Sequence, residues 1–177
     1  MREGENRHDG KVTIRLRAME PEDLELLYQI ENNRSLWKVG VTNVPYSRYM
    51  LHEYIAHATG DIFTDKQVRM MIEDESSRVV GVIDLMNFEP QHQRAEVGIV
   101  ICEAFRHQGM ATAALGEIIQ YARDVVHLHQ LFAYIDTENE ESIRLFRKVG
   151  FERTALLRDW LFDGRVYHHV LFMQLFF

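Results

Sequence analysis

Residues 96–123, EVGIVICEAFRHQGMATAALGEIIQYAR, place a basic turn and very small side chains where a helix is expected to begin. Arg106 and His107 supply positive charge, while Gly109 and Ala111 leave the backbone uncovered. Because the first amides of a helix lack intrahelical partners and carry partial positive charge, such a turn can hold a phosphate. The simpler alternative is that the glycine only turns the chain and the alanines pack a helix closely on a sheet.

The spacing of this turn argues against two common nucleotide sites. It does not match G-x-x-x-x-G-K-[ST], the loop that cradles nucleoside triphosphates. It also does not match G-x-G-x-x-G following a first strand, so a dinucleotide-binding fold is not expected. A general nucleotide-binding α/β domain stays open as an alternative, disfavoured by the lack of a glycine-rich first turn.

The elements that position this turn follow from the pattern of apolar residues. Period-two alternation and short apolar runs predict strands, at residues 12–17, 66–73, 78–88, 93–101, 130–136, 151–159 and 165–176. Helical periodicity and capping residues predict helices, at 19–33, from Ser47 to Ala58, at 109–125 and at 139–150. Asp163-Gly164 is typical of a hairpin turn between the last two strands. This order predicts one mixed α/β domain.

Length and composition agree with an ordinary globular domain. The chain has 177 residues, of which 46% are apolar and 27% charged, and no apolar run approaches the roughly 20 residues of a membrane span. Residues 1–10, MREGENRHDG, are predicted to be a disordered leader and lack the apolar segment of a signal peptide. Cys102 is the only cysteine, which favours the cytoplasm. The net charge of -7 disfavours a nucleic-acid partner.

Three separated motifs resemble the GCN5-related N-acetyltransferases, the GNAT superfamily. RHQGMA at 106–111 resembles the R/Q-x-x-G-x-G/A signature of that family, and RAEVGIVI at 94–101 resembles its fourth strand. DTENEESIRLFRKVGF at 136–151 resembles its D-x-x-N-x-x-S/A-x-x-x-F/Y-x-K-x-G-F segment. The most similar subgroup contains the ribosomal-protein alanine and spermidine acetyltransferases. The resemblance implies an α/β (α+β) fold over 11–177, with a mixed sheet of about seven strands, helices on both faces, and splayed strands four and five.

The resemblance also implies that acetyl-CoA binds as a co-substrate at the splayed strands, without a metal. The residues expected to contact it belong to the end of the fourth strand, the turn and two helices, and are Val100, Ile101, Arg106, His107, Gln108, Gly109, Met110, Ala111, Thr112, Asn139, Ser142 and Phe146. Asn139 is in addition a plain N-cap for the later helix. The histidines at 127–129 and 167–169 lack the accompanying spacing of a metal site.

Glu96 is the candidate general base. In residues 94–101 it shares one strand face with Gly98, and a glycine inside a strand often marks a bulge or a close approach to the backbone. A carboxylate beside the splayed strands can take a proton from an ammonium substrate. The alternative is that Glu96 pairs with Arg94 or another surface cation.

The leaving thiolate needs a different donor. Many relatives carry tyrosine at the position of Phe146, and a phenyl ring cannot donate a proton. Tyr134 is the candidate substitute by residue type, although an aromatic residue in a strand is more typically part of the core. A non-catalytic acyl-CoA-binding sensor is the alternative that Phe146 favours.

These observations predict an acetyl-CoA-dependent N-acetyltransferase that transfers directly to a primary amine in a ternary complex. The acceptor is a small polyamine or diamine, or a protein N-terminal amine, with neither nucleic acid nor membrane as a partner and with a homo-oligomer left open. Spermidine acetyltransferases carry polyamine-binding acids at places that here hold Asn43 or Val44, and Asn87, which weakens the polyamine interpretation. The acids expected near the site are Asp84, Glu89 and Glu96.

Overall fold

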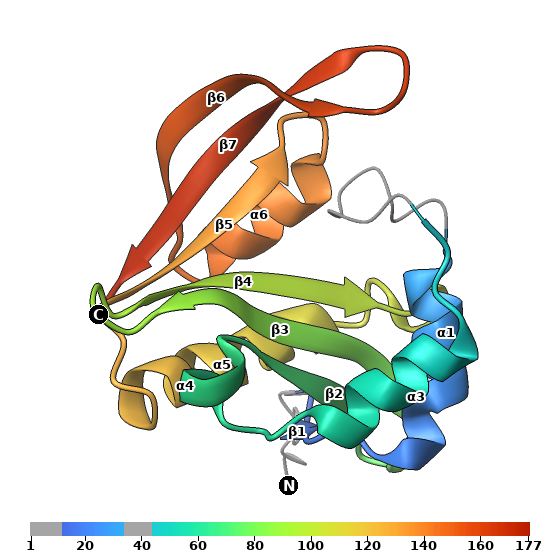
Figure 1. Cartoon of the computed structure of the whole chain (residues 1–177). Coiled ribbons are helices and arrows are strands. Elements are labelled where there is room, and N and C mark those ends of the chain that lie inside the picture. The colour runs from blue at the N-terminus through green and yellow to red at the C-terminus, as the bar shows by residue number, and fades with distance from the viewer. Residues whose placement is uncertain (1–11, 34–43) are drawn as a thin grey trace, which may run out of the picture.

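A seven-stranded sheet with the strand order β1-β2-β3-β4-β5-β7-β6 organises the chain in this computed structural model, which describes residues 12–33 and 44–177 (Figure 1). The predicted leader over residues 1–10 and Asn43 lie outside the described residues. The strands are β1 (Ile14–Arg17), β2 (Val68–Asp74), β3 (Val79–Glu89), β4 (Arg94–Ile101), β5 (Gln130–Asp136), β6 (Glu152–Phe162) and β7 (Tyr167–Phe176). All seven predicted strands are therefore present, with ends shifted by a few residues at most.

Among the strands of the described residues, only β4 and β5 are parallel neighbours. Their pairing is short: it begins at Arg94 with Gln130 and ends at Glu96 with Phe132. Beyond these residues the two strands separate, as Figure 1 shows. We call the region between β4 and β5 beyond this last pair the splay. The predicted mixed sheet with splayed fourth and fifth strands is confirmed.

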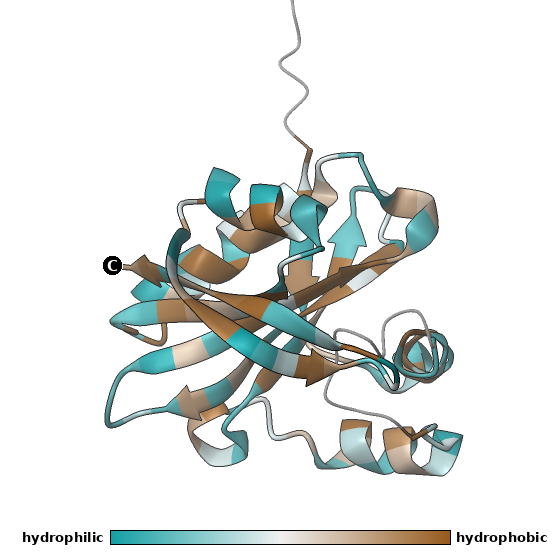
Figure 2. Cartoon of the chain, turned by 90° about the horizontal axis from the view of Figure 1, so that it is seen from above, coloured by the Kyte–Doolittle hydropathy of each residue, from teal (hydrophilic) through white to brown (hydrophobic). Residues whose placement is uncertain are grey.

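Helices cover both faces of the sheet, as Figure 2 shows, and the central strands between them are mostly hydrophobic. The helices are α1 (Leu24–Glu31), α3 (Arg48–His57), α4 (Ile62–Asp65), α5 (Met110–Asp124) and α6 (Glu140–Lys148), with short 3-10 turns η1 (Pro21–Asp23) and η2 (Glu103–Phe105). No helix in the described part of the chain is long and apolar enough to cross a membrane. The helix α4 was not predicted, because four residues are too few to show a period.

The start of α3 is the predicted one, and only part of its apolar surface is buried. Ser47 caps the helix, since its hydroxyl oxygen accepts from the Met50 amide at 3.1 Å. Of the apolar residues of this helix, Leu51 is buried, whereas Met50 is 53% exposed. The helix packs mainly on α1. It therefore buries a narrow row of side chains along one side and leaves its other apolar side chains half-buried or exposed.

Two apolar cores lie on opposite faces of the sheet. The first core lies under α5 and α6 and includes Leu115, Ile118 and Val97. The second core lies under α1 and α3 and includes Leu27 and Leu51, with Val100 of β4 packed against it. The alternation predicted for β4 is confirmed, because Val97 and Val100 belong to different cores. Glu96 consequently lies on the face that α1 and α3 cover.

Candidate active site

The splay opens at the carboxyl end of β4 and β5, where two helices begin. The chain leaves β4 through η2 and enters α5, and it leaves β5 through a short turn and enters α6. Sites in α/β proteins form outside the carboxyl ends of adjacent parallel strands, because helix N-termini and loop residues converge there. The topology thus brings together the basic turn at residues 106–109, the start of α6 and the face of β4 that holds Glu96.

The basic turn has the backbone geometry that its glycine suggested. Gly109 is the N-cap residue of α5 with a φ of +83°, and His107 also has a positive φ of 60°. A Cβ atom at position 109 would lie 3.1 Å from Cγ2 of Val12, so a side chain there has little room. The turn residues from Arg106 to Gly109 are exposed, and the first-turn residues Met110, Ala111 and Thr112 are half-buried. The amides at this helix start are therefore uncovered by large side chains.

Two side chains of the turn fold back on the backbone instead of pointing outward. The Nε of Arg106 donates to the carbonyl oxygen of Ile101 at 3.1 Å, and the Nε2 of Gln108 donates to that of Ala104 at 3.1 Å. Ile101 was expected to contact acetyl-CoA, and its carbonyl oxygen already accepts a hydrogen bond from Arg106.

Val100 also differs from expectation. Its carbonyl oxygen is directed at Gly81 of β3, where an added Cβ would collide with it. Because successive residues of a strand direct their backbone groups to opposite sides, the groups of β4 that face the splay are those of Val97, Ile99 and Ile101. Val100 was expected to contact acetyl-CoA, and in this register its carbonyl oxygen faces β3 and is not available for that contact.

The start of α6 is capped as predicted. The Oδ1 of Asn139 accepts from the amide of Ser142 at 3.1 Å, which confirms the N-cap. Phe146, two turns further, is only 4% exposed and packs edge-on against Phe151 with ring centroids 5.0 Å apart. Its ring belongs to the first core, on the opposite side of the sheet from Glu96.

Within the described ranges, 12–33 and 44–177, Glu96 is held by an amide and not by a cation. The Nδ2 of Asn87 donates to Oε2 of Glu96 at 2.7 Å. Arg94 pairs instead with Glu89, with its Nη2 at 2.9 Å from Oε2, so the alternative of a Glu96–Arg94 pair is wrong. Burial raises the pKa of Glu96, and the hydrogen bond from Asn87 partly opposes that rise. A carboxyl with a raised pKa that pairs with no cation in the described part of the chain is suited to accept a proton.

Gly98 occupies a regular position opposite Asp84, so the bulge considered for it is absent from the pairing of β3 with β4. The alternative, a close approach, is correct: a Cβ at Gly98 would lie 2.8 Å from the terminal methyl of Met86. Met86 in turn pairs with Glu96 across the strands. The glycine therefore gives room to the side chain beside Glu96.

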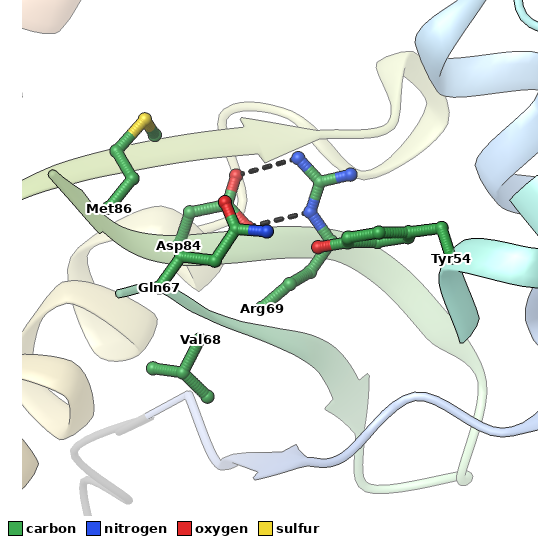
Figure 3. Close-up of a pocket in the computed structure, with 6 residues that line it drawn as sticks. All are labelled: Tyr54, Gln67, Val68, Arg69, Asp84 and Met86. Atoms are coloured by element: carbon green, nitrogen blue, oxygen red, sulfur yellow. Dashed lines mark hydrogen bonds and ion pairs between the residues drawn. The ribbon is translucent and has the colours of Figure 1, made fainter. Parts of the chain in front are cut away.

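A buried ion cluster continues this row of the sheet. Arg69 of β2 pairs directly with Asp84, its Nε donating at 2.7 Å and its Nη2 at 2.9 Å, and its Nη1 also contacts Glu31 of α1. Figure 3 shows Arg69 and Asp84 beside Tyr54, around a cavity of about 50 Å³ that Met86 also lines. Burial alone would lower the pKa of Arg69, but the two carboxylates outweigh it and raise that pKa. The expected acid Asp84 is thus neutralised by an internal cation.

Tyr134 lies in β5, two residues past Phe132, which is the partner of Glu96. In a parallel pair these positions share a face, so Tyr134 borders the splay on the face of Glu96. Its side chain is 41% exposed and stacks on Trp160 with centroids 6.1 Å apart, so the alternative of a core residue is wrong. Burial raises the pKa of Tyr134, as does the charge of Glu96.

One histidine of the 167–169 segment is surrounded by carboxylates. The Nδ1 of His168 lies 3.5 Å from Asp136 and 3.4 Å from Glu138, and its Nε2 lies 3.3 Å from Asp163. The interaction with Asp163 is the main reason that the pKa of His168 is raised. Ion pairing of these acids with a protonated His168 ring explains why the four side chains lie together. One of the acids, Glu138, is largely in water, with 78% of its side chain exposed.

Sequence reasoning missed two features of this site. The contact of Asn87 with Glu96 had one signal, because Phe88 breaks the alternation that Leu85 begins. Arg69, a cation within the apolar run of β2, is the other, and its partner was not deducible from spacing. The structure does bring Glu96, Tyr134 and the basic turn to the same region of the sheet, whereas it places Phe146 in the core.

Comparison with known proteins adds independent information. A family model described as an acetyltransferase (GNAT) domain matches residues 13–152. The spermidine N(1)-acetyltransferase of Escherichia coli strain K12 is 27% identical over 168 residues, which cover 93% of this chain and 86% of that protein.

Solved structures match over nearly the whole chain. Spermidine N-acetyltransferase from Vibrio cholerae in complex with CoA and spermine gives a TM-score of 0.82 at 24% identity, covering 92% of this chain and 95% of that one. A dodecameric structure of spermidine N-acetyltransferase from the same organism gives a TM-score of 0.78 at 24% identity, covering 92% and 93%. At this level of identity the likeness establishes the shared fold.

Proposed function

This chain belongs to the acetyltransferase (GNAT) family and is an acetyl-CoA-dependent N-acetyltransferase, and from this premise we propose that its acceptor is a primary aliphatic amine of the polyamine class. The observation that carries the proposal is Glu96, a half-buried carboxylate beside the splay that no cation in the described residues neutralises. The names of the similar enzymes, which include a structure with CoA and spermine, support the same acceptor class.

The cofactor contacts are proposed at the basic turn and the start of α6. Amides of Gly109, Met110 and Ala111 at the start of α5 would hold the pyrophosphate of acetyl-CoA, with Arg106 adding positive charge and His107 a ring N–H donor. The pantetheine chain would follow the splay along β4. Contacts from Thr112, Asn139 and Ser142 stay predictions of the same kind, as does one from the buried Phe146.

We expect Gly109→Ala to weaken acetyl-CoA binding by about tenfold or more, a loss comparable to that of about one hydrogen bond. The new methyl group would sit on the backbone at the point where phosphate must approach, and 3.1 Å from Val12. The measurement is the dissociation constant of acetyl-CoA by calorimetry, with the melting temperature recorded beside it.

Gly164→Ala is the matched control. Gly164 has a similar φ of +95°, in the β6–β7 turn, and an added Cβ there meets nothing within 4 Å. Both variants therefore carry the backbone strain of a non-glycine residue in the left-handed region, and only Gly109→Ala changes the proposed phosphate site. Equal affinity for acetyl-CoA in the two variants would remove the turn from the cofactor site.

The transfer itself is proposed to use Glu96 as base and Tyr134 as acid. Glu96 takes a proton from the ammonium group, and the neutral nitrogen attacks the thioester carbonyl carbon. A carbon–nitrogen bond forms, the carbon–sulfur bond breaks, and the sulfur takes the hydroxyl proton of Tyr134. The second proton of the nitrogen reaches Tyr134 through solvent, and Glu96 releases its own, so each turnover frees one proton. The raised pKa of Tyr134 keeps the phenol protonated before the step.

We expect Tyr134→Phe to lower kcat by about 10²-fold, at the lower end of what a general acid supplies, with little change in the KM for acetyl-CoA. The phenyl ring keeps the contacts with Trp160 and Phe172, so the variant removes only the hydroxyl group. Steady-state kinetics measure both constants. A variant with the kcat of the parent would mean that the thiolate departs without Tyr134.

The acceptor class is tested by following thiol release from acetyl-CoA with a panel of amines. We expect spermidine, spermine and a diaminoalkane to be acetylated with higher kcat/KM than a peptide that begins with alanine. Preference for the peptide would favour the second candidate acceptor, a protein N-terminal amine. Binding of acetyl-CoA without thiol release in any reaction would contradict the proposed acceptors and favour the sensor alternative.

A homo-oligomer is proposed on separate grounds. The edge strand β6 exposes Leu156, Trp160 and Phe162, each about half or more, and β7 exposes Tyr167 and Phe176. Monomeric proteins rarely leave such a set of large apolar side chains on an edge hairpin. The dodecameric assembly of the similar Vibrio cholerae enzyme supports the same conclusion. Sedimentation as a monomer at every concentration would contradict it.

A further inference from the structure

Asn87 lies where β3 departs from regular pairing with β4. Met86 pairs with Glu96 and Glu89 pairs with Arg94, so three steps along β3 match two steps along β4. One extra residue in a strand is a β-bulge, and it changes which face the following side chains occupy. Asn87 has a φ of +50°, a left-handed conformation in which asparagine is enriched.

The bulge brings the Asn87 amide to Glu96. In a regular strand Asn87 would point away from the face of Met86 and Glu96, because successive side chains alternate. Instead Phe88, 4% exposed, takes the place in the first core. The Nδ2 of Asn87 is then free to donate to Oε2 of Glu96 at 2.7 Å. This contact exists because of the backbone irregularity.

The donor on Glu96 is neutral, and this suits a base. A guanidinium or ammonium partner would cancel the charge of the carboxylate and favour its ionised form too strongly for easy protonation. Arg94, two residues away on the same strand, binds Glu89 instead. An amide donor orients the carboxylate through one oxygen and leaves its negative charge available to an incoming ammonium group.

From this geometry we propose that Asn87 is a positioning residue of the acetyl transfer, which orients Glu96 and supports its ionised form while leaving it able to accept a proton. The inference rests on the base role proposed above for Glu96 and adds the residue that orients this base. Among the described residues, the other charged or titratable groups on this side of the sheet are Arg94 and Glu89 beside Glu96, Tyr134 on β5, and the paired Arg69 and Asp84 further along the same face.

The direction of the expected change follows from the contacts. Burial raises the pKa of Glu96, and the bond from Asn87 lowers it. Removal of the amide therefore raises this pKa further, so Glu96 loses its charge at a higher pH. An aspartate at position 87 would place a second carboxylate against the first, and the pair would share a proton with an upper pKa that is higher still.

The test is to titrate the carboxyl NMR signal of Glu96 in the parent, in Asn87→Gly and in Asn87→Asp, with Glu96→Gln assigning the signal. Glycine keeps a positive φ without strain, and aspartate keeps the shape of asparagine. We expect the midpoint to rise from parent to Asn87→Gly and to be highest in Asn87→Asp, by about one pH unit or more. The acid limb of kcat/KM should shift by the same amount in Asn87→Gly.

Ser77→Gly is the control for the backbone change. Ser77 also has a positive φ, of 58°, but it lies in the turn between β2 and β3. In Ser77→Gly, the titration midpoint of Glu96 and the acid limb of kcat/KM should equal those of the parent. Titration midpoints of Glu96 in Asn87→Gly and Asn87→Asp that both equal the midpoint of the parent would overturn the inference. Midpoints that shift while the acid limb does not follow would also overturn it for catalysis, and would locate the failure in the base role of Glu96.

Discussion

Glu96→Gln is expected to lower turnover by about 10²- to 10⁴-fold near neutral pH while the affinity for acetyl-CoA stays that of the parent. A primary aliphatic amine is mostly protonated at this pH and cannot attack a carbonyl carbon until it loses a proton. Glutamine has nearly the shape of glutamate and its carbonyl oxygen can still accept from Asn87, so the variant removes the base and little else.

The loss should grow as the pH is lowered. Without a base, the variant depends on amine that is already neutral, and this fraction falls about tenfold for each pH unit below the pKa of the amine. The parent keeps its rate until the pH falls through the raised pKa of Glu96, where the carboxylate itself takes up a proton. The measurement is kcat/KM for the amine from about pH 6 to about pH 9 in both proteins.

Two results separate the explanations for Glu96. Equal rates for variant and parent over that pH range would rule out a base role. A loss of the same size at every pH would point to a role in binding the amine rather than in removing its proton. Arg94→Gln serves as the control, because it removes a charge from the same strand without touching the carboxylate of Glu96.

Arg69→Met is expected to reduce the free energy of unfolding by about 3–5 kcal/mol, the cost of leaving one member of a buried ion cluster without its partner. The side chain of Arg69 is 19% exposed and that of Asp84 is 15% exposed, so water replaces the lost guanidinium poorly. The aliphatic part of the side chain is preserved by methionine. Chemical denaturation of the variant and the parent measures the difference.

Arg15→Met is the matched control for this prediction. Arg15 is 69% exposed, and its partner Glu73 also binds Arg17, so the expected loss is less than about 1 kcal/mol. Removal of both charges, in Arg69→Met with Asp84→Leu, should recover part of the stability because only one carboxylate of the cluster, that of Glu31, is then left facing position 69. Equal losses for Arg69→Met and Arg15→Met would mean that the cluster contributes no more than a surface pair.

The elements and their order were within reach of the sequence because their signals are local. The strand predicted over 130–136 is observed as Gln130–Asp136, and the predicted caps Ser47 and Asn139 both accept the expected hydrogen bonds. The position of Gly109 at the start of α5 likewise follows from a few neighbouring residues. A helix cap and a strand period each depend on residues close in the chain, so no tertiary information is needed.

The chemistry of the site depended on contacts between distant strands. Spacing alone kept open a pairing of Glu96 with Arg94 and a core position for Tyr134, and the structure contradicts both alternatives. Asp84 had the right residue type for a free acid, yet Arg69 neutralises it from the neighbouring strand.

The sequence by itself determined the fold class, the family motifs and the face of β4 on which Glu96 lies. Only the tertiary structure decided which groups touch Glu96, because the register between β3 and β4 and a single extra residue set those contacts. A shift of one residue moves a side chain to the other face of a sheet, and the composition of one strand does not specify that shift. The bulge at Asn87 is such a shift, and it places a neutral donor where the sequence offered a cation.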